Sequence, residues 1–282
     1  MTKLHDRGNI GHTSFAEEEG VALNRWGQDR RIFKELIRLL DKKKTPAIFP
    51  GQFVLEIGKF FLGTSYVAGT LETKGGEHLV VNLRGFDCVT FVENVVALVW
   101  NIRSGKKSYE AFRKSLQKIR YRGGRLQGYP SRLHYFSDWI HDNEKKGIVK
   151  DVTAKIGGRP LKKVMTFLTT NPGLYPPLKH AANLRRMKSV ERAISRRSLF
   201  FIPKNDLRRL EYWISDGDLI AITTKTKGLD VQHVGLAARV KNRIHLLHAS
   251  SVDREVVLSK KTLYRYLAQS RVRSGIMVAR VV

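Results

Sequence analysis

Apolar residues recur at helical spacing through the first two thirds of the chain. This pattern predicts helices at about residues 22–42, 52–62, 88–102, 109–119, 131–146 and 181–197. Residues 69–77 form a linker rich in glycine and charge, and residues 171–177 form a loop that contains prolines. We therefore expect an N-terminal helical region over 1–80 and a second unit over 81–282 that carries a helical insertion.

The pattern changes to short β-rich runs in the last third. Strands are expected at residues 219–223, 233–240, 244–249, 255–258 and 276–282, with a helix at 261–270, and an earlier strand at 149–156. Helices that precede an antiparallel sheet indicate an α+β fold.

Composition limits the class of protein. The chain has 282 residues, of which 42% are hydrophobic, so it can bury a large core. No run approaches the roughly 20 apolar residues of a membrane-spanning helix, and we expect a soluble globular protein. Residues 1–31 mix charged and polar groups without an apolar core, which is not the pattern of a secretory signal peptide.

The formal net charge of +27 predicts attraction to anionic partners such as nucleic acid, acidic lipid or an acidic polymer. Basic residues gather at 42–44, 113–125, 185–188 and 192–197, but these clusters are scattered and form no known nucleic-acid motif. A solvated basic surface is the simpler interpretation, and we expect no nucleic-acid partner.

Cys88 is the single cysteine, so no internal disulfide can form. Asp87 stands where a helix N-cap is expected, and Ser104-Gly105 is a plausible stop for the same helix. A cysteine in the first turn faces unpaired backbone N–H groups and the positive end of the helix dipole, which favour the thiolate. Cys88 is therefore a candidate nucleophile, and the alternative is a small buried side chain.

His233 lies in a predicted strand, two residues before a glycine that leaves room for close approach by another group. If the next turn is centred on Lys241 and Asn242, His233 lies opposite Ser250 and Gly235 lies opposite His248. Alternation then puts His233 and His248 on one face and His245 on the other. His248 could orient the His233 ring, and a register error of one residue would transfer that role to His245.

Several segments in order resemble a known family. They are 82–94 (NLRGFDCVTFVEN), 131–140 (SRLHYFSDWI), 217–221 (GDLIA), 233–235 (HVG), 248–251 (HASS) and 274–280 (SGIMVAR). They resemble the NlpC-type, papain-like cysteine peptidase superfamily, in its N-acetylmuramoyl-L-alanine amidase-like branch, once a domain of unknown function. The resemblance covers about residue 52 to the C-terminus, and residues 89–93 depart from the small residue and glycine that usually follow the Asp-Cys pair.

The resemblance implies a papain-like core in which the helix of Cys88 packs on the sheet of His233 and His248. The implied activity is cysteine-dependent cleavage of the N-acetylmuramoyl-L-alanine bond in peptidoglycan fragments, with no cofactor or metal. Helical spacing puts Ser131, His134, Tyr135 and Asp138 on one polar face that could line a substrate cleft. The remaining candidate substrate-binding residues, which precede or cap the Cys88 helix, are Asn82 and Asp87.

Three alternatives stay open at this point. The enzyme could be a D,L-endopeptidase of the stem peptide, or a zinc enzyme with His233, His248 and Cys88 or Asp87 as ligands. It could also be a non-catalytic basic module that binds the cell wall or nucleic acid. We expect a bacterial cell envelope or periplasmic location if a signal has been removed, and a cytoplasmic location otherwise.

Overall fold

The computed structural model describes residues 15–42, 50–73 and 75–282. Of the segment 1–31, which lacks the pattern of a signal peptide, residues 1–14 therefore lie outside the described residues. The helices are α1 Phe15–Lys42, α2 Pro50–Phe60, α3 Cys88–Arg103, α4 Tyr109–Arg120, α5 Phe136–Lys145, α6 Phe167–Thr170, α7 Ala181–Ser195, α8 Leu207–Leu210 and α9 Leu263–Ala268. The strands are β1 Ser65–Tyr66, β2 Gly85–Phe86, β3 Val149–Asp151, β4 Arg159–Leu161, β5 Leu199–Pro203, β6 Leu219–Thr224, β7 Val231–Val240, β8 Arg243–Ser250, β9 Glu255–Thr262 and β10 Arg273–Val281.

The strands form one mixed sheet of ten, which confirms the predicted α+β class. Their order is β2-β1-β9-β8-β7-β6-β10-β5-β4, and β3 pairs with β10 beside this path. The short β1–β2 pair is parallel, whereas β5 to β10 pair with their neighbours in antiparallel fashion. The last third of the chain therefore builds the centre of the sheet, as its β-rich pattern predicts.

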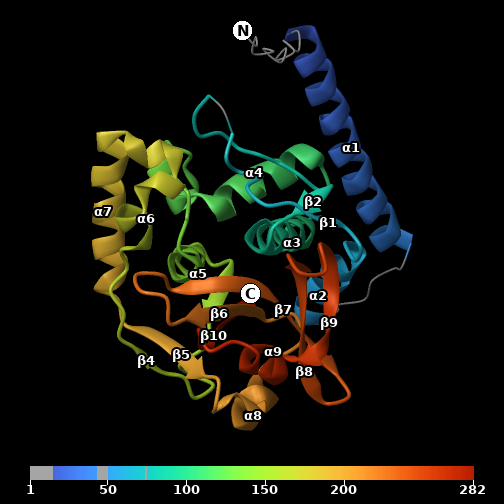
Figure 1. Ribbon diagram of the computed structural model, residues 1–282. Helices are drawn as coiled ribbons and strands as arrows, with labels where there is room; N and C mark the ends of the chain where they lie inside the picture. The colour runs from blue at the N-terminus through green and yellow to red at the C-terminus, as the bar shows by residue number, and fades with distance from the viewer. Residues whose placement is uncertain (1–14, 43–49, 74) are drawn as a thin grey trace, which may run out of the picture.

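Each face of the sheet has its own apolar core. Val234, Leu236 and Leu247 belong to the core that includes α3 and α4, whereas Ala237 and Leu246 belong to the core with α8 and α9. Figure 1 shows α3 and α4 above the central strands and α8 and α9 below them. The alternation of β7 and β8 between these two cores follows from the two-residue period of a strand.

Helix α3 lies in the middle of the first core. Its valines disfavour a helix by intrinsic preference, but seven of its apolar residues are buried, and the burial of their surface outweighs the weak preference. The predicted stop is also confirmed, because Ser104 is the C-cap and Gly105 has a φ of 70°. The structure thus fixes the start of α3, where Cys88 lies, against the sheet.

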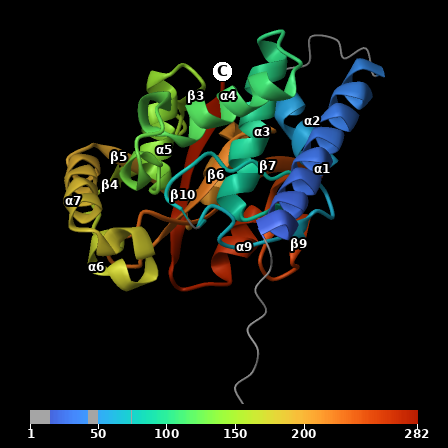
Figure 2. The ribbon, with the colours of Figure 1, turned by 90° about the horizontal axis from the view of Figure 1, so that it is seen from above.

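The segment before residue 80 contributes to the same core. Val54 and Ile57 of α2 are buried with α3, and β1 pairs with both β2 and β9. Helix α1 runs along one side of the molecule, and Figure 2 shows it beside α2 and α3. The predicted division between 1–80 and 81–282 stays a prediction.

Two predicted elements are shorter than expected. The helix predicted at 131–146 begins only at Phe136, because Pro130 lies in a 3-10 turn and Arg132 forms a bridge with Tyr121 in extended conformation. The strand predicted at 149–156 ends at Asp151, because the chain then closes a turn in which the N–H of Gly158 donates to the Thr153 carbonyl. Strands β1, β2, β4 and β5 were not predicted.

No helix in the described part of the chain is both long and apolar enough to cross a lipid bilayer.

Candidate active site

The first turn of α3 places Cys88 at the junction between helix and sheet. Asp87 is the N-cap, and its Oδ1 accepts hydrogen bonds from the Thr90 N–H at 2.7 Å and the Thr90 hydroxyl at 2.9 Å. Thr90 Oγ1 accepts the Asp87 N–H at 2.9 Å in return, which completes a capping box. This arrangement confirms the predicted cap, whereas the role of Asp87 as a substrate-binding residue stays a prediction.

Burial determines the protonation state of Cys88. Desolvation raises the pKa of the Cys88 thiol to about 12, and the nearby Asp87 carboxylate also raises it. Hydrogen bonding by the backbone N–H groups of Val234, Cys88 and Val89 lowers this pKa, but by less. The expectation that the helix N-terminus would favour the thiolate is therefore wrong for the unliganded protein, because desolvation outweighs the backbone contribution.

The β7–β8 hairpin has the predicted register. Lys241 and Asn242 adopt positive φ values of 45° and 63°, as a tight two-residue turn requires, and Leu236 pairs with Leu247. His233 Nε2 and His248 Nδ1 lie 2.7 Å apart. The ring of His245 lies elsewhere, with its Nδ1 2.9 Å from the Ser259 carbonyl.

Gly235 makes room for this contact. A Cβ added to Gly235 would lie 2.9 Å from the His248 Cβ and 2.9 Å from Leu246 side-chain atoms, closer than real Cβ atoms come. The glycine two residues after His233 therefore permits the close approach that its position in the sequence predicts.

Both histidines are neutral over the physiological pH range. Burial lowers the pKa of His233 to about 3, and His248 and Arg273 lower it further. Burial also lowers the pKa of His248 to about 4, where the Asp253 carboxylate opposes and Arg273 adds to the effect. Because the two rings share one short contact, one nitrogen donates and the other accepts.

Three further residues surround these groups and were not predicted from the sequence. The Tyr266 ring, from α9, lies 6.1 Å from the His233 ring and 5.5 Å from the His248 ring between centroids. Arg273 stacks on Tyr266 with its Cζ 4.0 Å from the ring centroid. Tyr66, from β1, has a pKa that is raised mainly by desolvation and also by Cys88 and Asp87.

The sequence carries little signal for these three. Tyr66 lies in a two-residue strand that is too short to show a period, and Tyr266 is one of two tyrosines in a short helix. Arg273 is one of 52 basic residues. Their positions depend on how β1, α9 and β10 pack, which spacing along the chain does not reveal.

Comparison with known proteins agrees with this geometry. Residues 56–276 match the family described as N-acetylmuramoyl-L-alanine amidase-like. The chain belongs to this family. A crystal structure of an N-acetylmuramoyl-L-alanine amidase from Bacteroides uniformis is 40% identical, covers 83% of this chain and 99% of its own, and superposes with a TM-score of 0.79.

Two other solved structures extend the comparison. A Bacteroides fragilis protein, provisionally named a xylanase, is also 40% identical over 80% of this chain and 99% of its own, with a TM-score of 0.76. A Legionella pneumophila protein is 22% identical over 92% of this chain and 96% of its own, with a TM-score of 0.68, which shows a shared fold. Among curated protein sequences, none matches.

The predicted polar face over residues 131–138 does not exist as a helix face, and this part of the interpretation is wrong. Ser131, His134 and Tyr135 precede α5, and their side chains are used within the protein. The Ser131 hydroxyl donates to the Gly128 carbonyl at 2.6 Å. The ring of His134 lies 2.9 Å from the Tyr129 carbonyl through Nε2, and burial lowers its pKa to about 3.

The other two residues of this segment are also enclosed. The Tyr135 hydroxyl donates to Glu191 at 2.7 Å, and the pKa of Tyr135 is raised, mainly by desolvation. Asp138 pairs with Arg122 at 2.7 Å and with Arg197 at 2.6 Å. These contacts make the segment a buried structural network in the family member described here.

Asn82 lies in the loop before β2. Its Oδ1 accepts the Arg84 N–H at 3.0 Å, which closes a local turn in the approach to the Cys88 helix. Its role as a substrate-binding residue stays a prediction.

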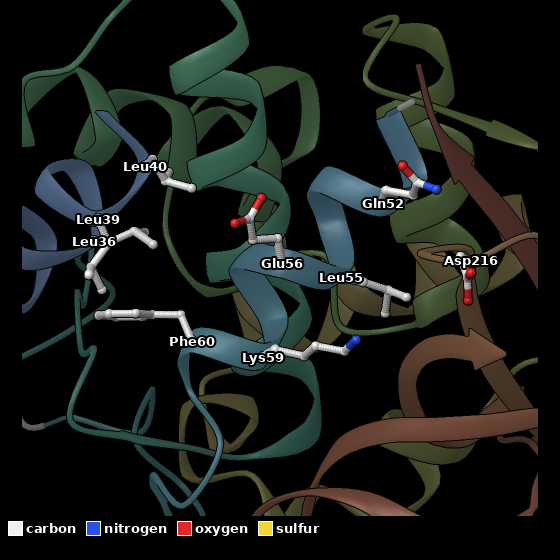
Figure 3. A pocket seen from close by; sticks show the side chains of 9 residues that line it. All are labelled: Leu36, Leu39, Leu40, Gln52, Leu55, Glu56, Lys59, Phe60 and Asp216. Atoms are coloured by element: carbon white, nitrogen blue, oxygen red, sulfur yellow. The ribbon is translucent and has the colours of Figure 1, made fainter. Parts of the chain in front are cut away.

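A separate pocket of about 670 Å³ lies between α1 and α2 (Figure 3). Leucines of α1 and Phe60 lie at one end of the pocket, and Gln52 and Lys59 of α2 extend toward Asp216 at the other end. It contains neither Cys88 nor the two histidines, so it is not part of the candidate active site.

Within residues 15–42, 50–73 and 75–282, no three His, Cys, Asp or Glu side chains are grouped closely enough to hold a metal ion. The zinc alternative therefore has no preformed set of ligands among these residues.

Proposed function

We propose that this protein is a cysteine-dependent amidase of the NlpC type that cleaves the N-acetylmuramoyl-L-alanine bond of muropeptides. Cys88 is the nucleophile, His233 is the general base, and His248 positions the His233 ring. The observation that carries this proposal is the contact of 2.7 Å between His233 Nε2 and His248 Nδ1. Val234, the residue after His233 in β7, donates its backbone N–H to the Cys88 thiol, so the histidine pair and the cysteine lie close together.

The contact between the His233 and His248 rings determines which nitrogen of His233 can act as the general base. His233 Nε2 is engaged by His248, so Nδ1 remains to take a proton. For Nδ1 to be a base, Nε2 must carry the ring proton and donate it to His248 Nδ1. His248 thus holds the reactive tautomer of His233, the task that an orienting residue performs in a catalytic triad.

A neutral pair is the resting state that the surroundings support. With the pKa of Cys88 raised to about 12 and that of His233 lowered to about 3, neither group is charged near pH 7. The described residues contain no hydrogen bond between the Cys88 thiol and His233. Catalytic contacts are often loose before substrate binds, and we expect this one to tighten in the complex.

The reaction then proceeds in two steps, formation of a thioester on Cys88 and its hydrolysis. The Cys88 thiol transfers its proton to His233 while sulfur attacks the lactyl carbonyl, and the backbone N–H of Cys88 donates to the developing oxyanion. The C–N bond breaks, and His233 returns the proton to the L-alanine nitrogen. Water adds to the thioester with its proton passing through His233, which releases the lactyl carboxylate and restores the thiol.

The substrate assignment rests on family membership and on the similarity to the Bacteroides uniformis N-acetylmuramoyl-L-alanine amidase. Defined muropeptides, analysed by mass spectrometry, test it. We expect a sugar with a free lactyl carboxylate and an intact peptide that begins with L-alanine. Release of L-alanine still attached to muramic acid would support the D,L-endopeptidase instead, and cleavage of a sugar–sugar bond would contradict both.

A chelator separates the thiol mechanism from the zinc alternative. We expect activity to be unchanged by a chelator and to be lost on treatment with iodoacetamide. Loss with the chelator and recovery with zinc would reverse the assignment of the nucleophile. Absence of any turnover with folded protein would favour the non-catalytic module.

A further inference from the structure

Two adjacent aromatic side chains are unusually exposed on the surface that follows α8. Tyr212 is 77% exposed and Trp213 is 60% exposed, and their rings meet edge to face with centroids 5.3 Å apart. They belong to a 3-10 turn, Glu211–Trp213, next to α8, which Figure 1 places at the lower edge of the molecule. Large apolar surface kept in water at one place indicates a contact surface.

The backbone below the two rings is held firmly. Arg239, from β7, donates through Nη2 to the carbonyls of Glu211 at 3.1 Å and Tyr212 at 3.4 Å, and also to that of Ile214. Arg280, from β10, donates to the Trp213 carbonyl at 3.4 Å. Arginines from two strands of the central sheet therefore fix the position of the backbone that carries the aromatic pair.

The charge around the pair is positive. The nearby carboxylates all have partners within the protein. Glu211 forms an ion pair with Arg243, Asp218 forms one with Arg280, and Asp216 accepts a hydrogen bond from the Arg239 backbone N–H. The charged side chains that remain exposed beside the pair are cationic. We call them, with Val240 and the two rings, the aromatic patch: Arg208, Arg209, Tyr212, Trp213, Val240 and Lys241.

The β7–β8 turn belongs to this patch because the Arg239 guanidinium donates hydrogen bonds to both the β7–β8 turn and the 3-10 turn. Arg239 Nη1 donates to the Asn242 carbonyl at 3.4 Å while Nη2 reaches the 3-10 turn. The turn that carries Lys241 and Val240, 36% exposed, is therefore linked through its backbone to the 3-10 turn that carries the aromatic rings. Within the described residues, neither Arg209 nor Lys241 forms an ion pair, so both charges can meet an anionic partner.

We propose that the aromatic patch binds the surface of an anionic lipid bilayer. Tyrosine and tryptophan rings are favourable at the boundary between headgroups and acyl chains, and basic residues around them are attracted to anionic lipid. Aromatic side chains also bind glycan chains, but a sugar ring stacks on a flat platform. The 85° angle between the two rings and the engagement of the nearby carboxylates fit a bilayer better.

Sedimentation with vesicles tests this surface without using the amidase reaction. At about 150 mM salt, we expect the protein to bind vesicles that contain phosphatidylglycerol and to bind pure phosphatidylcholine much more weakly. Tyr212→Ser with Trp213→Ser leaves the net charge unchanged and should weaken binding about tenfold or more. Arg209→Gln with Lys241→Gln should weaken it about thirtyfold, at about 1 kcal/mol for each charge.

The matched control is Leu174→Ser, since Leu174 is 67% exposed and lies outside the patch. It should bind like the unaltered protein. Equal binding by the Tyr212/Trp213 variant would show that the overall charge alone attracts lipid, and the proposal would then be wrong. Stronger binding to insoluble glycan than to vesicles would overturn it as well.

Brominated lipids provide a measurement on the unaltered protein, which does not depend on how a double variant folds. They should quench the emission of Trp213, and Trp213→Phe should remove the quenched component. An emission that brominated lipid leaves unchanged would contradict insertion of the ring. Hydrolysis of soluble muropeptide should be the same for the patch variants, so this test and that of the proposed function fail separately.

Discussion

The histidine pair and the 131–138 segment both contain polar side chains inside the protein, but the two regions differ in how those side chains are paired. In the segment, the polar groups of Ser131, Tyr135 and Asp138 are all satisfied by partners within the protein. At the pair, His233 has one nitrogen engaged by His248, and its Nδ1 has no hydrogen-bond partner in the described part of the chain. An imidazole nitrogen without a partner is able to accept a proton, whereas the paired groups of Ser131, Tyr135 and Asp138 stabilise the fold.

The largest expected effect is that of Cys88→Ala. Removal of the nucleophile should lower kcat by about 10⁴-fold or more, with little change in the free energy of unfolding. Amine release from a defined muropeptide and thermal unfolding of the same sample check both parts. Activity within tenfold of the unaltered protein would remove Cys88 from the mechanism.

His248→Ala is expected to come next. The loss of the partner that fixes the His233 tautomer should lower kcat by about 10²-fold. His245→Ala is the matched control, because His245 lies in the same strand but contacts the Ser259 carbonyl, and its effect should be below about threefold. An equal loss in the two variants would mean that His248 acts only through the stability of the hairpin.

The sequence predicts the parts of this site that local geometry determines. Asp87 caps α3 through atoms of Thr90, three residues away, and the turn at Lys241 and Asn242 sets the pairing that brings His248 to His233. Each of these contacts depends on short spacing within one element or one hairpin. They can therefore be inferred from residue type and periodicity alone.

What the sequence misses depends on packing between distant segments. The 131–138 residues match a helical period, but Pro130 and the Tyr121–Arg132 bridge hold the chain extended until Phe136. The raised pKa of Cys88 is a second case, because the helix N-terminus is visible in the sequence and the desolvation is not. Burial of a particular atom is a property of the assembled fold.

A smaller effect, on stability and not on catalysis, is expected for Asp138→Asn. The Asp138 side chain is 1% exposed, whereas Arg122 and Arg197 are 33% and 21% exposed, so water can partly replace the lost charge. We expect the free energy of unfolding to fall by about 2–3 kcal/mol, with kcat for folded enzyme almost unchanged. Urea unfolding and activity below the transition measure the two separately. A stable variant without activity would instead place Asp138 in the substrate site.

The smallest expected effect comes from Arg273→Gln. The charged side chains that act on the two histidines are Arg273 from β10 and Asp253 after β8, and the neutral Tyr266 ring from α9 lies beside them. The charge of Arg273 lowers the pKa of both histidines, so its removal should raise them from about 3 for His233 and about 4 for His248. Since the base must be neutral, activity is lost as pH falls through its pKa, and the acid limb of kcat/KM should move to higher pH.

The acid dissociation constant should change by less than about tenfold, with almost no effect on kcat/KM at pH 7. Arg273→Lys keeps the charge but not the planar stacking on Tyr266, so it should leave the acid limb in place. Asp253→Asn should instead lower the pKa of His248, because the Asp253 carboxylate raises that pKa. Titration of the histidine ring protons by NMR, together with the pH profile, separates these variants. If Arg273→Gln and Asp253→Asn shifted the pKa of His248 in the same direction, electrostatic control of the pair by these two side chains would be ruled out.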